Sequence, residues 1–141
     1  MSWEISPAVA EVQLDATMGL ANSGSGHSVL LLFTSTKPAP GASAGASPQV
    51  VFELANPCAE KVGAVWKLLP REAGGSIVLE TGAPVWGRWL GASGEWMGDA
   101  TVTDPAGAGG IRVSGGVTAP GATSPTLYAG GLALLGEVSF A

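Results

Sequence analysis

Residues 29–53 read VLLLFTSTKPAPGASAGASPQVVFE, and this stretch decides the class of fold. Two apolar runs stand at its ends. The connection between them, residues 36–48, consists of Pro, Gly, Ala, Ser and Thr around a single charged residue, Lys37. Short apolar runs rich in Val, Leu and Phe between Gly/Pro segments are typical of β-strands. The first run, residues 27–35, is apolar on both faces, which predicts a central strand or one whose second face is covered.

The rest of the chain repeats this pattern. Further strands are predicted at residues 49–54, 61–69, 76–80, 85–90, 95–103, 111–114, 127–129 and 131–140. The sequence GASG at residues 91–94 predicts a hairpin turn. About eight or nine short strands at this spacing favour a mainly all-β fold, an antiparallel β-sandwich or jelly roll.

One helix is predicted ahead of the strands, over residues 7–21. Ser6 can cap it, and Pro7 suits its first position. Apolar residues then recur at helical spacing, namely Ala10, Leu14, Met18 and Ala21. We therefore expect a single domain in two parts. Residues 1–26 form an arm and a helix that packs on the sandwich and covers the first strand, and residues 27–141 form the sandwich.

Composition narrows the classes of partner. Of the 141 residues only 12% are charged, the net charge is −5, and the Lys and Arg residues are scattered. Nucleic-acid binding needs clustered Lys and Arg, so we expect no nucleic-acid partner. No apolar run reaches the length of a membrane span, and the N-terminus lacks a signal-peptide pattern, so we expect no membrane partner and synthesis in the cytoplasm. A weakly charged surface suits a packed assembly.

The sequence offers little for chemistry, and we expect no catalytic residue, cofactor or metal, and no enzyme. His27 is the only histidine, which leaves no zinc-binding spacing. Cys58 is the only cysteine, so no disulfide forms within the chain, and a small buried side chain is expected. Glu95 and Asp99 share a face of one predicted strand. At roughly 13 Å apart they are too distant for a glycosidase pair, so a solvated strand face is expected.

Tryptophans are the most informative side chains. Trp86 and Trp89 fall on opposite faces of one predicted strand, and Trp96 follows the GASG turn. Such a cluster has three interpretations, namely core packing, a protein interface and stacking on glycans. Trp3, ahead of the helix, is a candidate anchor for an N-terminal arm on a neighbour.

Two loops with at most one charged residue each are candidate contact segments. Residues 36–48 contain Lys37, Pro38 and Pro40, and residues 116–126 contain Pro120 and Pro125. Loops without charge are buried at small desolvation cost. The candidate interface residues are Trp3, Lys37, Pro38, Pro40, Trp86, Trp89, Trp96, Pro120 and Pro125.

Two motifs resemble a set of small tailed-phage virion proteins. The first is SVLLLFTSTKPAPG, an apolar strand that ends in an aromatic residue, small polar residues and Pro-Ala, here Phe33, Thr34-Ser35-Thr36 and Pro38-Ala39. The second is WGRWLGASGEWMGDATV, which carries Trp86, Arg88, Gly94, Gly98 and Asp99. Its turn has Ala92-Ser93 where the family usually has acidic residues. Gly130-Gly131 and the alternating strand to the end of the chain also fit.

The resemblance implies a bacteriophage virion structural protein without catalysis. The main expectation is a capsid decoration or cement protein, a dimer or trimer that binds the major capsid protein between subunits and stabilises the head. The alternative is a tail, baseplate or fibre component that binds glycans through exposed Trp. A cellular β-sandwich binding module remains a further alternative. The expected location is the virion.

Overall fold

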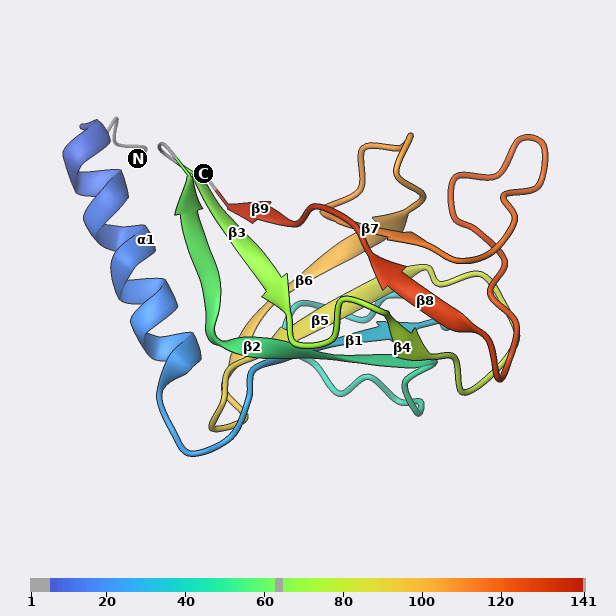
Figure 1. Cartoon of the computed structure of the whole chain (residues 1–141), viewed down its shortest axis with the longest axis horizontal. Coiled ribbons are helices and arrows are strands. Elements are labelled where there is room, and N and C mark those ends of the chain that lie inside the picture. The colour runs from blue at the N-terminus through green and yellow to red at the C-terminus, as the bar shows by residue number, and fades with distance from the viewer. Residues whose placement is uncertain (1–5, 63–64, 141) are drawn as a thin grey trace.

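The computed structural model describes residues 6–62 and 65–140, and within them the chain forms one helix and nine strands (Figure 1). In chain order the elements are α1 (Pro7–Asn22), β1 (Val29–Phe33), β2 (Val50–Val62), β3 (Val65–Pro70), β4 (Ser76–Ile77), β5 (Trp86–Leu90), β6 (Trp96–Thr103), β7 (Ile111–Ser114), β8 (Leu132–Leu135) and β9 (Ser139–Phe140). The prediction of a mainly β fold with one N-terminal helix is confirmed.

The described strands form one curled sheet in the order β4-β8-β7-β6-β5-β1-β2-β3-β9. The chain passes from β8 to β9 through residues 136–138 only, yet these strands lie near opposite ends of that order. The sheet must therefore curl until its two ends approach each other. At this closure the Leu79 N–H donates to the Gln49 carbonyl at 2.8 Å, and the Leu68 N–H donates to the Val138 carbonyl at 2.9 Å.

Strand β2 carries the sheet around a corner. Its first residues, Val50–Glu53, pair with β1, whereas residues 59–62 pair with β3. The register shifts between Leu54 and Ala59, where β2 advances five residues while β3 advances two, so the regular pairing of β2 is interrupted at its bend. The bend of β2 is visible in Figure 1.

Two predicted strands had wrong limits around this corner. The predicted strand 49–54 continues to Val62, and the predicted strand 61–69 is divided between β2 and β3, where Val62 and Val65 are paired. In the sequence, residues 61–69 alternate between two faces apart from a single glycine, Gly63, which is too weak a signal to predict the turn. Residues 63–64 lie outside the described residues.

The C-terminal half of the chain differs from expectation in three places. The predicted strand 76–80 is reduced to β4, residues 127–129 contribute only an isolated bridge between Gly82 and Leu127, and the predicted strand 131–140 is split into β8 and β9. The split falls at Gly136, whose N–H donates to the Arg112 carbonyl at 2.7 Å. Each of these segments ends where the sheet closes, and that closure depends on contacts between distant parts of the chain.

One strand pair is parallel, so the predicted antiparallel pairing is wrong at that place. Val102 pairs with Ile111, and Thr103 pairs with Arg112, in parallel between β6 and β7. Parallel neighbours normally need a crossover of a dozen or more residues. Here only the last two residues of β6 pair with the first two residues of β7. The loop 104–110 therefore leads the chain back along β6 by the rise of about one residue, roughly 3.3 Å.

Helix α1 begins as predicted and packs on a different strand from the one expected. The Ser6 side chain accepts the Val9 N–H at 3.2 Å, and Pro7 is the first helical residue. Met18 and Ala21 are buried, but the main contact of α1 is with β2, not with β1. The expectation that the helix mainly covers the first strand is therefore wrong, because β2 takes that place. Among the described residues, no helix is long and apolar enough to span a membrane.

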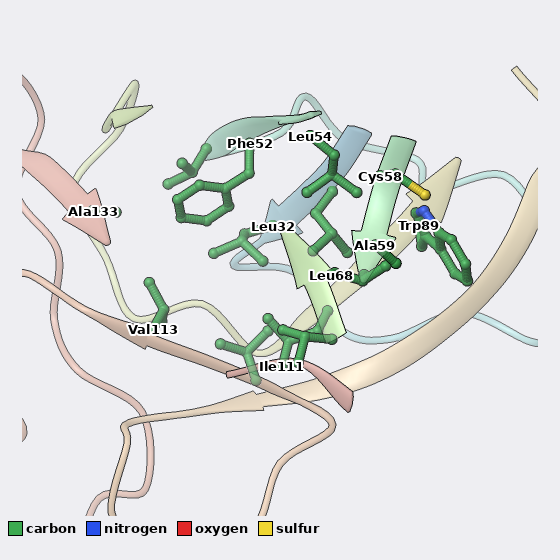
Figure 2. Close-up of a cluster of buried hydrophobic side chains, with 14 of the residues drawn as sticks. Leu32, Phe52, Leu54, Cys58, Ala59, Leu68, Trp89, Ile111, Val113 and Ala133 are labelled. Atoms are coloured by element: carbon green, nitrogen blue, oxygen red, sulfur yellow. The ribbon is translucent and has the colours of Figure 1, made fainter. Parts of the chain in front are cut away.

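The core fills the inside of the curled sheet. Figure 2 shows side chains from several strands converging there, among them Leu32, Phe52, Leu68, Trp89 and Ile111. The core also contains a buried polar side chain, Gln49, whose amide nitrogen donates to the Glu80 carbonyl at 3.0 Å and the Gly82 carbonyl at 2.8 Å. Gln49 thereby fastens the segment after β4 to the start of β2.

We expect Gln49→Ala to lower the free energy of unfolding by about 1–3 kcal/mol, because two carbonyls lose a buried donor. Urea unfolding followed by circular dichroism measures the change. The matched control is Gln13→Ala, since Gln13 lies on the exposed surface of α1. Equal stability of Gln49→Ala and the control would contradict a fastening role for Gln49.

Candidate functional site

Arg88 and Asp99 form a buried ion pair across the β5–β6 hairpin. The two residues are Cα partners, the Arg88 Nε donates to Asp99 Oδ1 at 2.7 Å, and the Arg88 Nη2 donates to Asp99 Oδ2 at 3.1 Å. Their side chains are only 11% and 2% exposed. The expectation that Asp99 lies on a solvated strand face is therefore wrong, because the paired strand supplies a cation that the local spacing does not reveal.

Glu95 takes no part in this pair. It lies in the turn ahead of β6, and the register shift between Trp89 and Leu90 breaks the alternation between Glu95 and Asp99. The predicted common strand face of the two carboxylates is therefore wrong. The β5–β6 hairpin itself, with its turn around Gly94, is confirmed.

The ion pair keeps both groups charged. Hydrogen bonding to Arg88 is the main cause that lowers the pKa of the Asp99 carboxyl from its ordinary 3.8, with burial acting in the opposite direction. Hydrogen bonding to Asp99 likewise raises the pKa of Arg88. A carboxylate with both oxygens occupied and a lowered pKa is a poor general acid near neutral pH. Asp99 is suited to holding structure together.

The same carboxylate attaches the long loop to the hairpin. The Trp96 indole N–H donates to Asp99 Oδ1 at 3.0 Å, and the Gly41 N–H points to Asp99 Oδ2 at 3.5 Å. Gly41 has φ +74°, and a Cβ there would lie 3.3 Å from the Trp96 ring. The loop 36–48 thus lies against the chain's own hairpin at Gly41, where a glycine is required.

On the other side of the pair, Arg88 contacts an aromatic stack. Its guanidinium carbon lies 5.2 Å from the centroid of the Trp86 ring, which stacks on Phe33 with centroids 4.4 Å apart. We call Trp86, Arg88, Trp96, Asp99 and Gly41 the Asp99 cluster. It connects β5, β6 and the loop 36–48 through one carboxylate.

The candidate interface residues separate by burial. Trp86, Trp89 and Pro125 are buried, which fits the core interpretation and leaves them without surface for a partner. Trp96 is 47% exposed, Pro40 and Pro120 are exposed, and Lys37 and Pro38 are half-buried. An interface role stays a prediction for these five. Trp3 lies outside the described residues.

The lone His and Cys side chains are both engaged in the fold. Cys58 is fully buried, and burial raises the pKa of its thiol, so the expectation of a small buried side chain is confirmed. The His27 Nδ1 lies 2.9 Å from the Leu54 carbonyl, a distance at which it donates to that oxygen. Within residues 6–62 and 65–140, His, Cys, Asp and Glu side chains form no group able to hold a metal ion.

The hollows along the sheet include a small cavity and an open groove. One is a cavity of about 120 Å³ lined mainly by apolar residues, including Leu30, Trp89 and Ile111. That volume is well below the roughly 300 Å³ at which ligand pockets usually begin. The other is an open groove of about 540 Å³ along β6, between Val85, Ala108 and Ser124.

Sequence reasoning missed an exposed apolar surface on β4 and β8. Ile77 and Leu132 are Cα partners, and both are 56% exposed, while Leu79 and Leu134 are 57% and 41% exposed. Their chain neighbours Val78 and Ala133 are buried instead. We call Ile77, Leu79, Leu132 and Leu134 the outer β4–β8 face. Residues 77–79 and 132–135 are apolar on both faces in sequence, so no local signal shows which face is outside.

We expect Asp99→Asn to lower the free energy of unfolding by about 3 kcal/mol, because it leaves the buried Arg88 without its counter-charge. Urea unfolding measures the loss. Glu95→Gln is the matched control, since it makes the same change on an exposed carboxylate of the same hairpin. The structural role of the ion pair would be refuted by equal unfolding midpoints for the two variants.

Acid should weaken the protein through Asp99. Because the folded pKa lies below 3.8, the contribution of Asp99 is complete above the unfolded pKa and is lost as pH falls through the folded value. The stability difference between the wild type and Asp99→Asn should therefore shrink as pH is lowered past 3.8. Urea midpoints measured at successive pH values test this, and a difference that grows in acid would contradict it.

Comparisons with known proteins identify no relative. No family model, no curated protein and no solved structure matches the chain.

Proposed function

We propose that the chain is a structural protein of a tailed-phage particle, most specifically a capsid decoration or cement protein that binds between capsid subunits. The two sequence motifs that resemble such proteins support the phage assignment. The proposal includes the finer fold prediction, that the two halves of the curled sheet act as the layers of a β-sandwich. Its partners are the major capsid protein and further copies of the chain, as a dimer or trimer.

The observation that carries a structural role is the amount of apolar side chain left on the surface in groups. The outer β4–β8 face is one group, and Val9, Val12 and Leu20 of α1, exposed by 46%, 66% and 50%, are another. Scattered apolar residues on a surface need no explanation, whereas contiguous groups mark interaction sites. In a chain with only 12% charged residues, such surfaces favour a protein that works by contact.

The Asp99 cluster supports the same proposal. Its two charged groups, Arg88 and Asp99, bind each other. Asp99 also contacts the Gly41 N–H, which holds the loop 36–48 on the hairpin. The tip of that loop beyond Gly41 is exposed over residues 42–43 and 45–47. A neutral loop held at one point can contact a neighbour with little loss of hydration and limited loss of entropy.

A specific observation favours the alternative, a tail, baseplate or fibre component that binds glycans. Trp96 is 47% exposed, and its indole N–H is fixed by Asp99. A fixed, half-exposed indole is able to stack on a sugar ring. Gly41 covers part of the ring, which leaves less surface for a sugar.

Quantitative mass spectrometry of purified particles tests the proposal. We expect the chain in the virion at a copy number comparable to that of the major capsid protein. A low copy number, together with quenching of Trp96 fluorescence by host polysaccharide, would favour the tail alternative. Absence of the chain from purified particles would overturn both.

A further inference from the structure

We propose that the cavity inside the curled sheet, beside Gly98 of β6, binds one small apolar molecule no larger than a benzene ring. We call this hollow the Gly98 cavity. The inference goes beyond the proposed function and does not depend on it, because it concerns the interior of a single copy of the chain.

The lining of the Gly98 cavity is mainly apolar and comes from distant parts of the chain. Five of its residues are buried and apolar: Leu30 in β1, Leu68 in β3, Trp89 in β5, Ile111 in β7 and Val138 just ahead of β9. Figure 2 shows Leu68, Trp89 and Ile111 on their separate strands. A molecule enclosed by such side chains gains dispersion contacts from several sides.

Gly98 leaves the cavity open where a side chain would otherwise fill it. Gly98 is the cross-strand partner of Trp89, and such partners point to the same face of a sheet. Because the Trp89 side chain is buried in the core, a side chain at position 98 would also point inward. A Cβ at Gly98 would meet no atom within 4 Å. The missing side chain of Gly98 is therefore one reason why the hollow exists.

The chemistry of the lining favours an apolar occupant over water. Among the described residues of the lining, Asp99 and Trp89 have polar side-chain atoms, and both are bound elsewhere. Asp99 points to the face opposite that of Gly98, where its carboxylate binds Arg88. The Trp89 indole N–H donates to Ser28 Oγ at 2.7 Å. A buried water needs about two to four polar partners, which a mainly apolar lining does not favour.

The volume of the cavity sets the size of the ligand. An engineered apolar cavity of about 150 Å³ in another protein stays dry and binds benzene or xenon. The Gly98 cavity is slightly smaller, about 120 Å³. It is too small for a ligand of ordinary size, and it suits one small ring or a short alkyl chain.

Glycines also leave an entrance to the cavity clear. Gly110 is exposed, and Gly98 and Ala100 are half-buried, whereas the five apolar residues named above are buried. The hollow therefore reaches the surface between the middle of β6 and the start of β7. Neither glycine has a side chain that could close this side.

Binding of benzene to the purified full chain tests the proposal. Benzene should raise the melting temperature in a saturable manner, because a ligand that binds only the folded state stabilises it. In nuclear magnetic resonance spectra, the methyl groups of Leu30 and Ile111 should shift most. Pyridine has the same shape as benzene and one polar nitrogen, which would lose its hydrogen bond to water. It should therefore bind at least about tenfold more weakly.

Gly98→Val should abolish the effect of benzene, because the added side chain fills the cavity. The matched control is Gly74→Val, since a Cβ at Gly74 would also meet no atom within 4 Å and Gly74 lies outside the cavity lining. This control should bind benzene as the wild type does.

Ile111→Val acts in the opposite direction, because it removes one CH₂ group from the lining and enlarges the cavity. It should raise the affinity for toluene relative to benzene by about fourfold, the effect of burying one further CH₂ group. This variant keeps the proposal testable should Gly98→Val fail to fold.

Any of five results would overturn the inference. These are a wild type that benzene does not stabilise, pyridine binding as tight as that of benzene, a Gly98→Val variant that keeps the benzene effect, a Gly74→Val variant that loses it, and an Ile111→Val variant with an unchanged preference between toluene and benzene. Each of them would leave the proposed function standing, since that proposal is tested by the composition of particles.

Discussion

The ion pair between Arg88 and Asp99 is the interaction on which the arrangement of β5, β6 and the loop 36–48 depends. It is buried on the β5–β6 hairpin, so neither charge is stable there without the other. Asp99 also accepts the hydrogen bond from the Trp96 indole. Gly41 of the loop 36–48 then lies against both Asp99 and the Trp96 ring. One ion pair thus fixes the position of the loop 36–48, which has only one charged residue of its own, Lys37.

The rest of the fold is built around closure of one sheet. The sheet bends at the interrupted pairing of β2 between Leu54 and Ala59, and Gln49 fastens the segment after β4 where the sheet closes. Closure places one face of β4 and β8 inside and leaves the other outside. The exposed apolar faces are therefore a consequence of the curl.

Several elements could be predicted from sequence because local signals specify them. The cap at Ser6 and Pro7 marked the start of α1, the turn around Gly94 marked the β5–β6 hairpin, and β7 has the predicted limits. The β2–β3 hairpin and the break between β8 and β9 could not be predicted. The local signal at each is a single glycine, Gly63 or Gly136, in an otherwise alternating pattern, and pairing with distant strands shows that the chain turns or breaks there.

The candidate site, too, could be predicted from the sequence only in part. The sequence drew attention to Trp86, Trp96 and Asp99, but not to the burial of Trp86 or to the pairing of Asp99 with Arg88. Those properties depend on which residues become cross-strand neighbours and on how the sheet curls over them.

By itself, the sequence determined the mainly β class, the helix and the low charge of the surface, because period, turn residues and composition are properties of short segments. Only the tertiary structure decided that Val78 and Ala133 face inward while Ile77 and Leu132 face outward. Both faces of β4 and β8 are apolar, so the choice between them is made by the closure of the sheet.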